Sequence, residues 1–198
     1  MIDIIKYGEF KPVGKQKKKH QIILTHTSRN INDYLQSLKF RLNGKYKRIP
    51  NYIVTRDGKI LQLLGNNEHS EYFNETNINR NSIIISLENL GWLKKEPLTN
   101  HYINWIGDIY KGKVFERKWR DYFFWQPYTE SQVENLGKLC NELFNLVKIK
   151  PQIIDHNTKI NGIEKYVGVV TKSNYDSEFT DVSPAFKFNE LLKYIENE

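Results

Sequence analysis

The chain has 198 residues, a formal net charge of +7 at pH 7, and contains 39% hydrophobic and 13% aromatic residues. This composition is typical of a folded chain and excludes a disordered one, and no stretch approaches the length of a membrane span. The basic balance favours anionic partners. Nucleic-acid binding is not expected, because the basic residues form no helix-borne stripe and no known reader motif.

We expect a single domain over residues 1–198, since no Pro-, Gly- or Ser-rich stretch divides the chain. Residues 1–19 are expected to form a basic N-terminal extension, with the run Lys15–His20 as a solvated loop. The N-terminus lacks the basic-then-apolar pattern of a secretory signal, so synthesis in the cytoplasm is expected. The single cysteine, Cys140, falls on the apolar face of a predicted helix and is expected to be a core residue.

The first strong pattern is the apolar strand Gln21–His26, which presents an imidazole at its end. A lone histidine here is either a metal ligand or a hydrogen-bonded surface residue. A short helix is expected next, capped by Ser28 or Asn30, and a strand followed directly by a helix is typical of α/β proteins. Residues 51–64 predict a β-hairpin turning at Asp57-Gly58.

Residues 81–89 contain consecutive β-branched side chains, which predict a central strand buried on both faces, with Ser86 and Glu88 on one face. Residues 91–128 are expected to be an aromatic-rich insertion with little regular structure. Its aromatic side chains either line a groove for sugars or peptides or pack beneath a long loop. They include all four tryptophans of the chain: Trp92, Trp105, Trp119 and Trp125.

Thr129 and Gln132 form the capping box of the clearest predicted helix, which is expected to end near Lys148. Residues 151–156 then predict a second apolar strand that ends in a histidine, His156. A short terminal helix is expected around Leu191.

Taken in order, these segments resemble the zinc-dependent N-acetylmuramoyl-L-alanine amidase family, which includes type 2 amidases, phage lysozymes of the amidase kind and peptidoglycan-recognition proteins. The resemblance covers residues 20–195. It is carried by Thr25-His26-Thr27, the hairpin, the strand 81–89, the long helix, the strand ending in His156 and the late sequence Thr-Asp-Val-Ser-Pro-Ala-Phe that contains Asp181. It implies an α/β domain in which helices flank a central mixed β-sheet, and a cleft where two histidines and an aspartate or cysteine hold Zn²⁺.

The resemblance implies that His26 is the first zinc ligand and Asp181 the last. We expect His156 to be the second histidine, because it repeats the strand-end position of His26. A second alignment runs through residues 166–174 and puts Lys172 at that position instead. A protonated lysine cannot donate a lone pair to Zn²⁺, so under this alignment the site holds no metal.

Two further positions depart from the family pattern. Ser86 stands where the family has a glutamate that takes a proton from the zinc-bound water, and Phe179 stands where it often has a lysine that stabilises the oxyanion. We expect Glu88 and Lys172 to supply these catalytic roles, the alternatives being a structural carboxylate and a solvated lysine. His69, Trp92 and Ser86 are the expected substrate-binding residues.

The leading hypothesis is a peptidoglycan amidase that hydrolyses the bond between N-acetylmuramic acid and L-alanine through a zinc-activated water. The alternative is an inactive pseudoamidase that binds peptidoglycan, an anionic ligand or a protein partner. A third possibility is a component of a phage virion. In each case the expected place of action is the cell wall, reached after release from the cytoplasm or from the virion.

Overall fold

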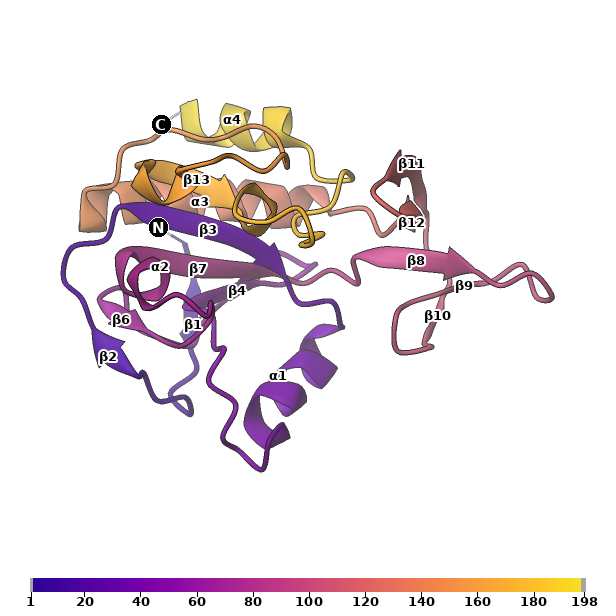
Figure 1. Cartoon of the computed structure of the whole chain (residues 1–198), viewed down its shortest axis with the longest axis horizontal. Coiled ribbons are helices and arrows are strands. Elements are labelled where there is room, and N and C mark those ends of the chain that lie inside the picture. The colour runs from indigo at the N-terminus through magenta and orange to yellow at the C-terminus, as the bar shows by residue number, and fades with distance from the viewer. Residues whose placement is uncertain (1, 197–198) are drawn as a thin grey trace.

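The computed structural model describes residues 2–196, and its body is built around one six-stranded mixed sheet (Figure 1). Four strands, β4, β7, β3 and β13, run parallel to one another, whereas β5 closes an antiparallel hairpin with β4 and pairs in parallel with β1. In spatial order the strands are β1 (Ile4–Lys6), β5 (Ile60–Gln62), β4 (Tyr52–Val54), β7 (Ser82–Leu87), β3 (Gln21–His26) and β13 (Gly168–Thr171).

The two central strands confirm the predictions made for them. Every residue of β3 and β7 is buried, as expected for parallel strands covered on both faces. The predicted hairpin is also present, and Gly58 at its turn has a φ of 86°, a conformation that favours glycine.

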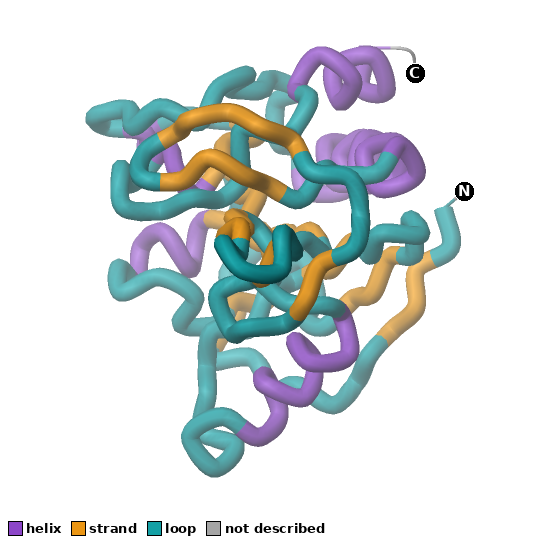
Figure 2. The backbone as a smooth tube through the Cα atoms, turned by 90° about the vertical axis from the view of Figure 1, so that its right-hand side faces the viewer, coloured by secondary structure: helices purple, strands orange, loops and turns teal. Residues whose placement is uncertain are grey.

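One face of the sheet is covered by α3 (Glu130–Val147) and α4 (Phe188–Glu196), which pack against each other and lie on the same side of the molecule (Figure 2). Alternate residues of β3, Ile22 and Leu24, point to this face and share a core with Leu136 of α3. Cys140 is in the same core, as predicted, and burial raises the pKa of its thiol to about 12.

The opposite face is covered by α1 (Ile31–Phe40), α2 (Thr76–Asn81) and two short 3₁₀ turns, Ile163–Lys165 and Lys172–Asn174. Ile23 of β3 packs here with Ile78, while Ile53 of β4 packs with Leu38 of α1. The sheet is therefore the middle of three layers, and the two-residue period of its strands divides the core between the outer layers.

The helix caps agree with the sequence in part. The Asn30 side chain accepts a hydrogen bond from the Asp33 amide and caps α1, and Thr129 caps α3 through the Gln132 amide. The predicted return bond of a capping box is replaced, because the Gln132 side chain instead donates to the carbonyl oxygens of Val54 (2.8 Å) and Glu88 (3.1 Å). Gln132 thus ties α3 to the ends of β4 and β7.

The N-terminal segment is more structured than an extension. Residues 4–6 form edge strand β1, and β2 (Gly14–Lys15) pairs with β6 (Glu68–His69). Lys19, expected in a solvated loop, is 2% exposed and donates to the carbonyl oxygens of Glu68 (3.2 Å) and Arg80 (2.9 Å). Burial lowers the pKa of this lysine to about 8.

The aromatic-rich insertion was predicted to lack regular structure, and this prediction is wrong. It folds into a five-stranded antiparallel sheet that projects from the body, which we call the arm (residues 92–125; Figure 1). The strands in spatial order are β10 (Ile109–Tyr110), β9 (Tyr102–Ile103), β8 (Trp92–Lys95), β12 (Tyr122–Trp125) and β11 (Phe115–Trp119). Ring contacts across the strands, such as Trp92 stacked on Tyr122 at 4.5 Å, stabilise it in place of an aliphatic core.

The predicted strand over residues 151–156 is also absent. This segment makes a single parallel bridge, Ile153 to Val169, at the outer edge of β13, and His156 follows in a loop. Among the described residues, no helix combines the length and the apolar character needed to cross a membrane.

Candidate functional site

The candidate site lies where three neighbouring parallel strands, β7, β3 and β13, end at the same edge of the sheet. Thr25 of β3 pairs with Ser86 of β7, and Thr171 of β13 pairs with Leu24. Lys172, the next residue after β13, is therefore level with Thr25 and adjacent to His26. Crevices outside the carboxyl ends of parallel strands are common ligand sites in α/β sheets.

Asp181 is the centre of this site. Its carboxylate accepts a short hydrogen bond from the Thr25 hydroxyl, and Lys172 Nζ lies 3.6 Å from Asp181 Oδ2. Ser173 holds the backbone in place, because its amide and hydroxyl both donate to the Asp181 carbonyl, at 2.8 and 2.6 Å. Burial alone would raise the pKa of Asp181, but Lys172, His26 and the Thr25 hydroxyl outweigh it and lower the pKa. Asp181 is therefore a buried, paired carboxylate.

His26 is 7% exposed and both of its ring nitrogens face protein atoms. Nδ1 lies 3.5 Å from the hydroxyl of Tyr128, and Nε2 faces Gly91 so closely that a Cβ at Gly91 would lie 2.9 Å from it. Burial lowers the pKa of His26; Asp181 opposes this shift and Lys172 adds to it. The imidazole is thus held as a neutral, enclosed group.

His156 does not join His26 and Asp181. Its side chain is exposed, and its Nδ1 accepts a hydrogen bond from the Thr158 amide at 3.2 Å. The physical reason is strand order: residues 151–156 run outside β13, so β13 separates them from β3, and neighbouring strands lie about 4.8 Å apart. Of the two alignments, the geometry brings Lys172 to the His26 and Asp181 pair.

Ser86 and Glu88 are both buried, but neither is free to act on a water molecule at this site. Glu88 Oε1 accepts from the Ile31 amide at the start of α1, and Oε2 accepts from the Arg56 amide, both at 2.9 Å. These contacts favour the structural role for Glu88. Ser86 is fully buried, so its hydroxyl has no access to solvent.

The remaining predicted residues lie in three different surroundings. Phe179 packs beneath Lys172, whose Nζ is 4.2 Å from the centre of its ring. The ring of His69 lies against Gly14 on the small β2–β6 sheet, and burial lowers the pKa of this histidine. Trp92 lies in the arm and stacks on Tyr122. Only Lys172 among the predicted catalytic and substrate-binding residues contacts the His26 and Asp181 pair.

Sequence reasoning missed several residues that shape the site. Tyr128 bridges the His26 imidazole and the Ser183 amide, which donates to the tyrosine hydroxyl at 3.3 Å. Tyr72 reaches the hydroxyl of Thr25, with the two oxygens 3.3 Å apart. Tyr128 directly precedes Thr129, the N-cap of α3. This position beside a recognisable helix start was the one local signal in the sequence that could have placed Tyr128 near the end of the sheet.

These residues do not fit a catalytic zinc. The donors at the sheet edge are one imidazole and one carboxylate, and the third group is an ammonium that has no lone pair to donate. Among residues 2–196, no cluster of three or more histidine, cysteine, aspartate or glutamate side chains could hold a metal ion. The expected set of His26, His156 and Asp181 is not assembled.

A profile described as N-acetylmuramoyl-L-alanine amidase matches residues 15–167, more than half of the chain. The chain belongs to the N-acetylmuramoyl-L-alanine amidase family. The matched region includes His26 but ends before Lys172 and Asp181. No curated protein sequence matches the chain at a significant level.

Solved structures support the same fold. The amidase LysC from Clostridium intestinale is 12% identical with a TM-score of 0.59, and the comparison covers 99% of each chain. The hydrolase AmiA from Staphylococcus aureus, solved with its ligand, is 12% identical with a TM-score of 0.58, covering 98% of this chain and 81% of that one. E. coli AmiD, solved with the substrate anhydro-N-acetylmuramic acid-L-Ala-D-γ-Glu-L-Lys, is 19% identical with a TM-score of 0.53, covering 94% of this chain and 60% of AmiD.

At these identities the structural similarity establishes the fold, and the profile establishes the family. The predicted fold class, an α/β domain with a central mixed sheet flanked by helices, is confirmed. The family consists of hydrolases that act on peptidoglycan and generally depend on zinc. In this chain Lys172, and not a second histidine, lies beside Asp181.

Proposed function

We propose that this family member binds peptidoglycan fragments and does not hydrolyse them by zinc-activated water. The observation that carries the proposal is the contact of Lys172 Nζ with Asp181 Oδ2 at 3.6 Å, beside the two residues that the family resemblance implies as metal ligands. The ammonium occupies one of the few oxygen donors there and adds a positive charge, which disfavours a cation.

The surroundings of the pair support the same proposal. A zinc hydrolase needs an open coordination position and a group to take the proton from the bound water. Here His26 is enclosed by Tyr128 and Gly91. The two oxygens of Glu88 are held by backbone amides, and a serine hydroxyl at position 86 is a poor base near neutral pH.

Peptidoglycan as the ligand is supported by the family and by charge. Structural neighbours were solved with muropeptides, among them E. coli AmiD and a Pseudomonas aeruginosa protein in complex with an anhydromuramic pentapeptide. The net charge of +7 favours a polymer whose stem peptides carry carboxylates. The place of action under this proposal is the cell wall, reached after release from the cytoplasm or from a virion.

The first experiment compares the wild-type chain with Lys172→His. Each protein is incubated with zinc sulfate, desalted and measured for bound zinc, for co-sedimentation with insoluble peptidoglycan, and for new L-alanine amino groups released from it. We expect the wild-type chain to sediment with peptidoglycan, to retain no stoichiometric zinc and to release no amino groups. Lys172→His, which adds a second neutral imidazole, is expected to retain about one zinc per chain.

Lys172→Met is the matched control, because it removes the ammonium without adding a ligand and should retain less zinc than Lys172→His. Stoichiometric zinc in the wild-type chain together with release of amino groups would overturn the proposal in favour of an active amidase. Absence of sedimentation with peptidoglycan would overturn the part of the proposal that assigns peptidoglycan binding to this chain.

A further inference from the structure

A second concentration of charge lies at the far end of α1, in residues 39–48, which we call the basic segment. It contains five cations and no carboxylate: Lys39, Arg41, Lys45, Lys47 and Arg48. Figure 1 shows α1 leading from the end of β3 to this segment at the lower edge of the body. Because α1 rises by 1.5 Å per residue over its length, about 15 Å separates the basic segment from the strand end that carries His26. The basic segment is therefore a surface distinct from the candidate site.

Much of the charge on the basic segment is not compensated. Lys39 pairs with Glu9 at 2.5 Å, and Lys47 pairs with Glu71 at 3.2 Å. The other three cations form no ion pair with any described carboxylate; they are Arg41, Lys45 and Arg48. An excess of positive charge in ten consecutive residues favours an anionic partner.

The basic segment also exposes two large apolar side chains. Phe40 is 69% exposed and Leu42 is 66% exposed. Leu42 has a left-handed φ of 54°, a conformation that disfavours residues with a Cβ, and its side chain gains no burial from it. Apolar side chains that alternate with cations in the sequence Lys-Phe-Arg-Leu are typical of surfaces that bind the interface of a lipid bilayer.

A cleft of about 700 Å³ lies between the basic segment and residues 9–13 of the N-terminal segment. Four lysines and one glutamate line it: Lys11, Lys39, Lys45, Lys47 and Glu9. Phe10, Val13 and Tyr46 supply apolar parts of its wall. Since lysine ammonium groups bind phosphate as point charges, the cleft offers space and charge for a phosphate group next to exposed apolar side chains.

The basic segment is fixed to the body at both ends. The Arg41 amide donates to the Ser37 carbonyl at the end of α1, and the Lys47 carbonyl accepts from the Glu71 amide, both at 3.1 Å. Between these points the Arg41 guanidinium lies 4.7 Å from the centre of the Tyr46 ring, which packs against the core beneath α1. The surface is thus formed before a ligand arrives, so binding orders little further chain.

We propose that the basic segment docks the protein on the surface of a bilayer that contains anionic phospholipids. A headgroup phosphate enters the cleft beside Lys11 and Lys45, and Phe40 and Leu42 pass between the headgroups. A soluble anionic polymer would satisfy the lysines but leave both apolar side chains in water, so a bilayer matches more of this surface. The inference goes beyond the proposed function and does not depend on it.

The test measures co-sedimentation of the full chain with sucrose-loaded vesicles that contain no peptidoglycan. One set consists of equal parts phosphatidylglycerol and phosphatidylcholine, and the other of phosphatidylcholine alone. We expect saturable binding to the first set, weakened by added sodium chloride, and little binding to the second. Absence of saturable binding to the anionic vesicles would overturn the inference.

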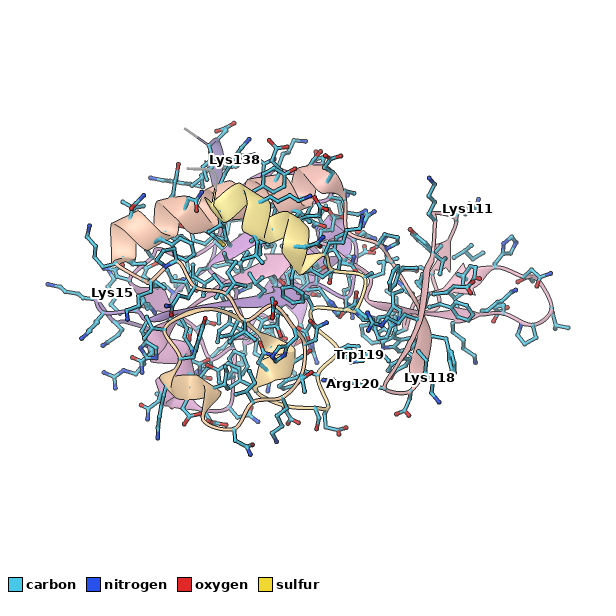
Figure 3. The ribbon with its side chains drawn as sticks, turned by 90° about the horizontal axis from the view of Figure 1, so that it is seen from above. Lys15, Lys111, Lys118, Trp119, Arg120 and Lys138 are labelled. Carbon is cyan, nitrogen blue, oxygen red and sulfur yellow. The ribbon has the colours of Figure 1, made fainter. Side chains whose placement is uncertain are left out.

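Two pairs of variants locate the binding. Lys45→Glu and Phe40→Ser are each expected to weaken binding to the anionic vesicles by about tenfold. The matched controls make the same changes at exposed positions of the arm, Lys111→Glu and Phe123→Ser, and should bind like the wild-type chain. Figure 3 shows that Lys111 lies out on the arm, as does Lys118. Circular dichroism checks that each variant is folded, and an equal loss of binding in the controls would contradict the location.

A dye placed at Phe40 distinguishes the bilayer from a soluble anionic polymer. Because Cys140, the single cysteine of the chain, is fully buried, Phe40→Cys provides an exposed thiol that a polarity-sensitive dye can label in the native protein. We expect the emission of this dye to shift to the blue on anionic vesicles, and that of the same dye at Phe123→Cys to stay unchanged. An unshifted dye at Phe40→Cys in protein that sediments with the vesicles would show attraction by charge alone and overturn the insertion of the apolar side chains.

Discussion

At the scale of single residues, Lys172 has the largest consequence for the site. Its ammonium lies 19% exposed beside a carboxylate that is 7% exposed, so much of the interaction is shielded from water. A metal ion and an ammonium both neutralise Asp181, but only the metal can polarise a carbonyl or generate hydroxide. The lysine thus neutralises the buried carboxylate, and under the proposed function it does so in place of a catalytic metal.

The pairing of Lys172 with Asp181 predicts that Lys172→Met changes the free energy of unfolding in a pH-dependent way. Near pH 7 the substitution should lower the free energy of unfolding by about 3 kcal/mol, the low end of the cost of breaking a buried pair. The pKa of Asp181 is lowered in the folded state, so the contribution of the pair is full above the unfolded-state pKa of about 3.9. It is lost as the pH falls through the lower folded-state value. Urea denaturation of both proteins across this range measures the difference.

Lys59→Met is the control for this prediction. Its partner, Asp57, is 2.6 Å away, but both side chains are more than half exposed, so the substitution should change stability little at any pH. A difference between wild type and Lys172→Met that stays constant down to the acid transition would contradict the role of the ion pair.

At the scale of elements, local patterns predicted much of the fold. The strand of residues 82–87, the hairpin at Gly58 and the helix after Thr129 each carry a signal within a few residues, and each is present. The arm was missed because its strands are short and mostly exposed, so no clear alternation of buried and exposed residues marks them. Aromatic contacts between strands stabilise it, and these contacts cannot be read from local sequence.

The Glu88 carboxylate joins the start of α1 to the turn of the β4–β5 hairpin, and a substitution of Glu88 tests this structural role. Its two oxygens accept from the Ile31 and Arg56 amides, and a glutamine would have to turn an NH₂ group toward one of these donors. Glu88→Gln should lower the free energy of unfolding by about 2 kcal/mol, because one buried amide loses its acceptor. Thermal and urea denaturation measure this loss.

The exposed Glu116 of β11 supplies the matched control, and Glu116→Gln should leave stability nearly unchanged. The catalytic role expected for Glu88 makes the opposite prediction, namely unchanged stability together with loss of any peptidoglycan cleavage. That result would contradict the structural role.

At the scale of the whole molecule, the site depends on which strand lies beside β3. Two apolar segments could occupy that position, residues 151–156 and residues 166–171, and local sequence does not distinguish them. The structure places Gly168–Thr171 there, with four paired residues, and leaves the other segment a single bridge. The resemblance named His26 and Asp181 as site residues, but which group lies beside Asp181 depends on contacts that only the assembled sheet defines.

The same assembly makes Cys140 a probe of global unfolding. The thiol is fully buried in the core shared by α3, α4 and the sheet, and burial raises its pKa to about 12. Because the thiolate is the reactive form, a thiol reagent should label the native chain only after this core opens. We expect the labelling rate in increasing urea to follow the population of unfolded chains measured by circular dichroism, when closing is faster than labelling.

Leu136→Ala, which removes a fully buried neighbour in α3, should lower the free energy of unfolding by about 3 kcal/mol and raise the labelling rate of Cys140 by the corresponding factor. Rapid labelling of the wild-type chain in buffer, with its circular dichroism unchanged, would instead show that α3 and α4 open independently of the sheet.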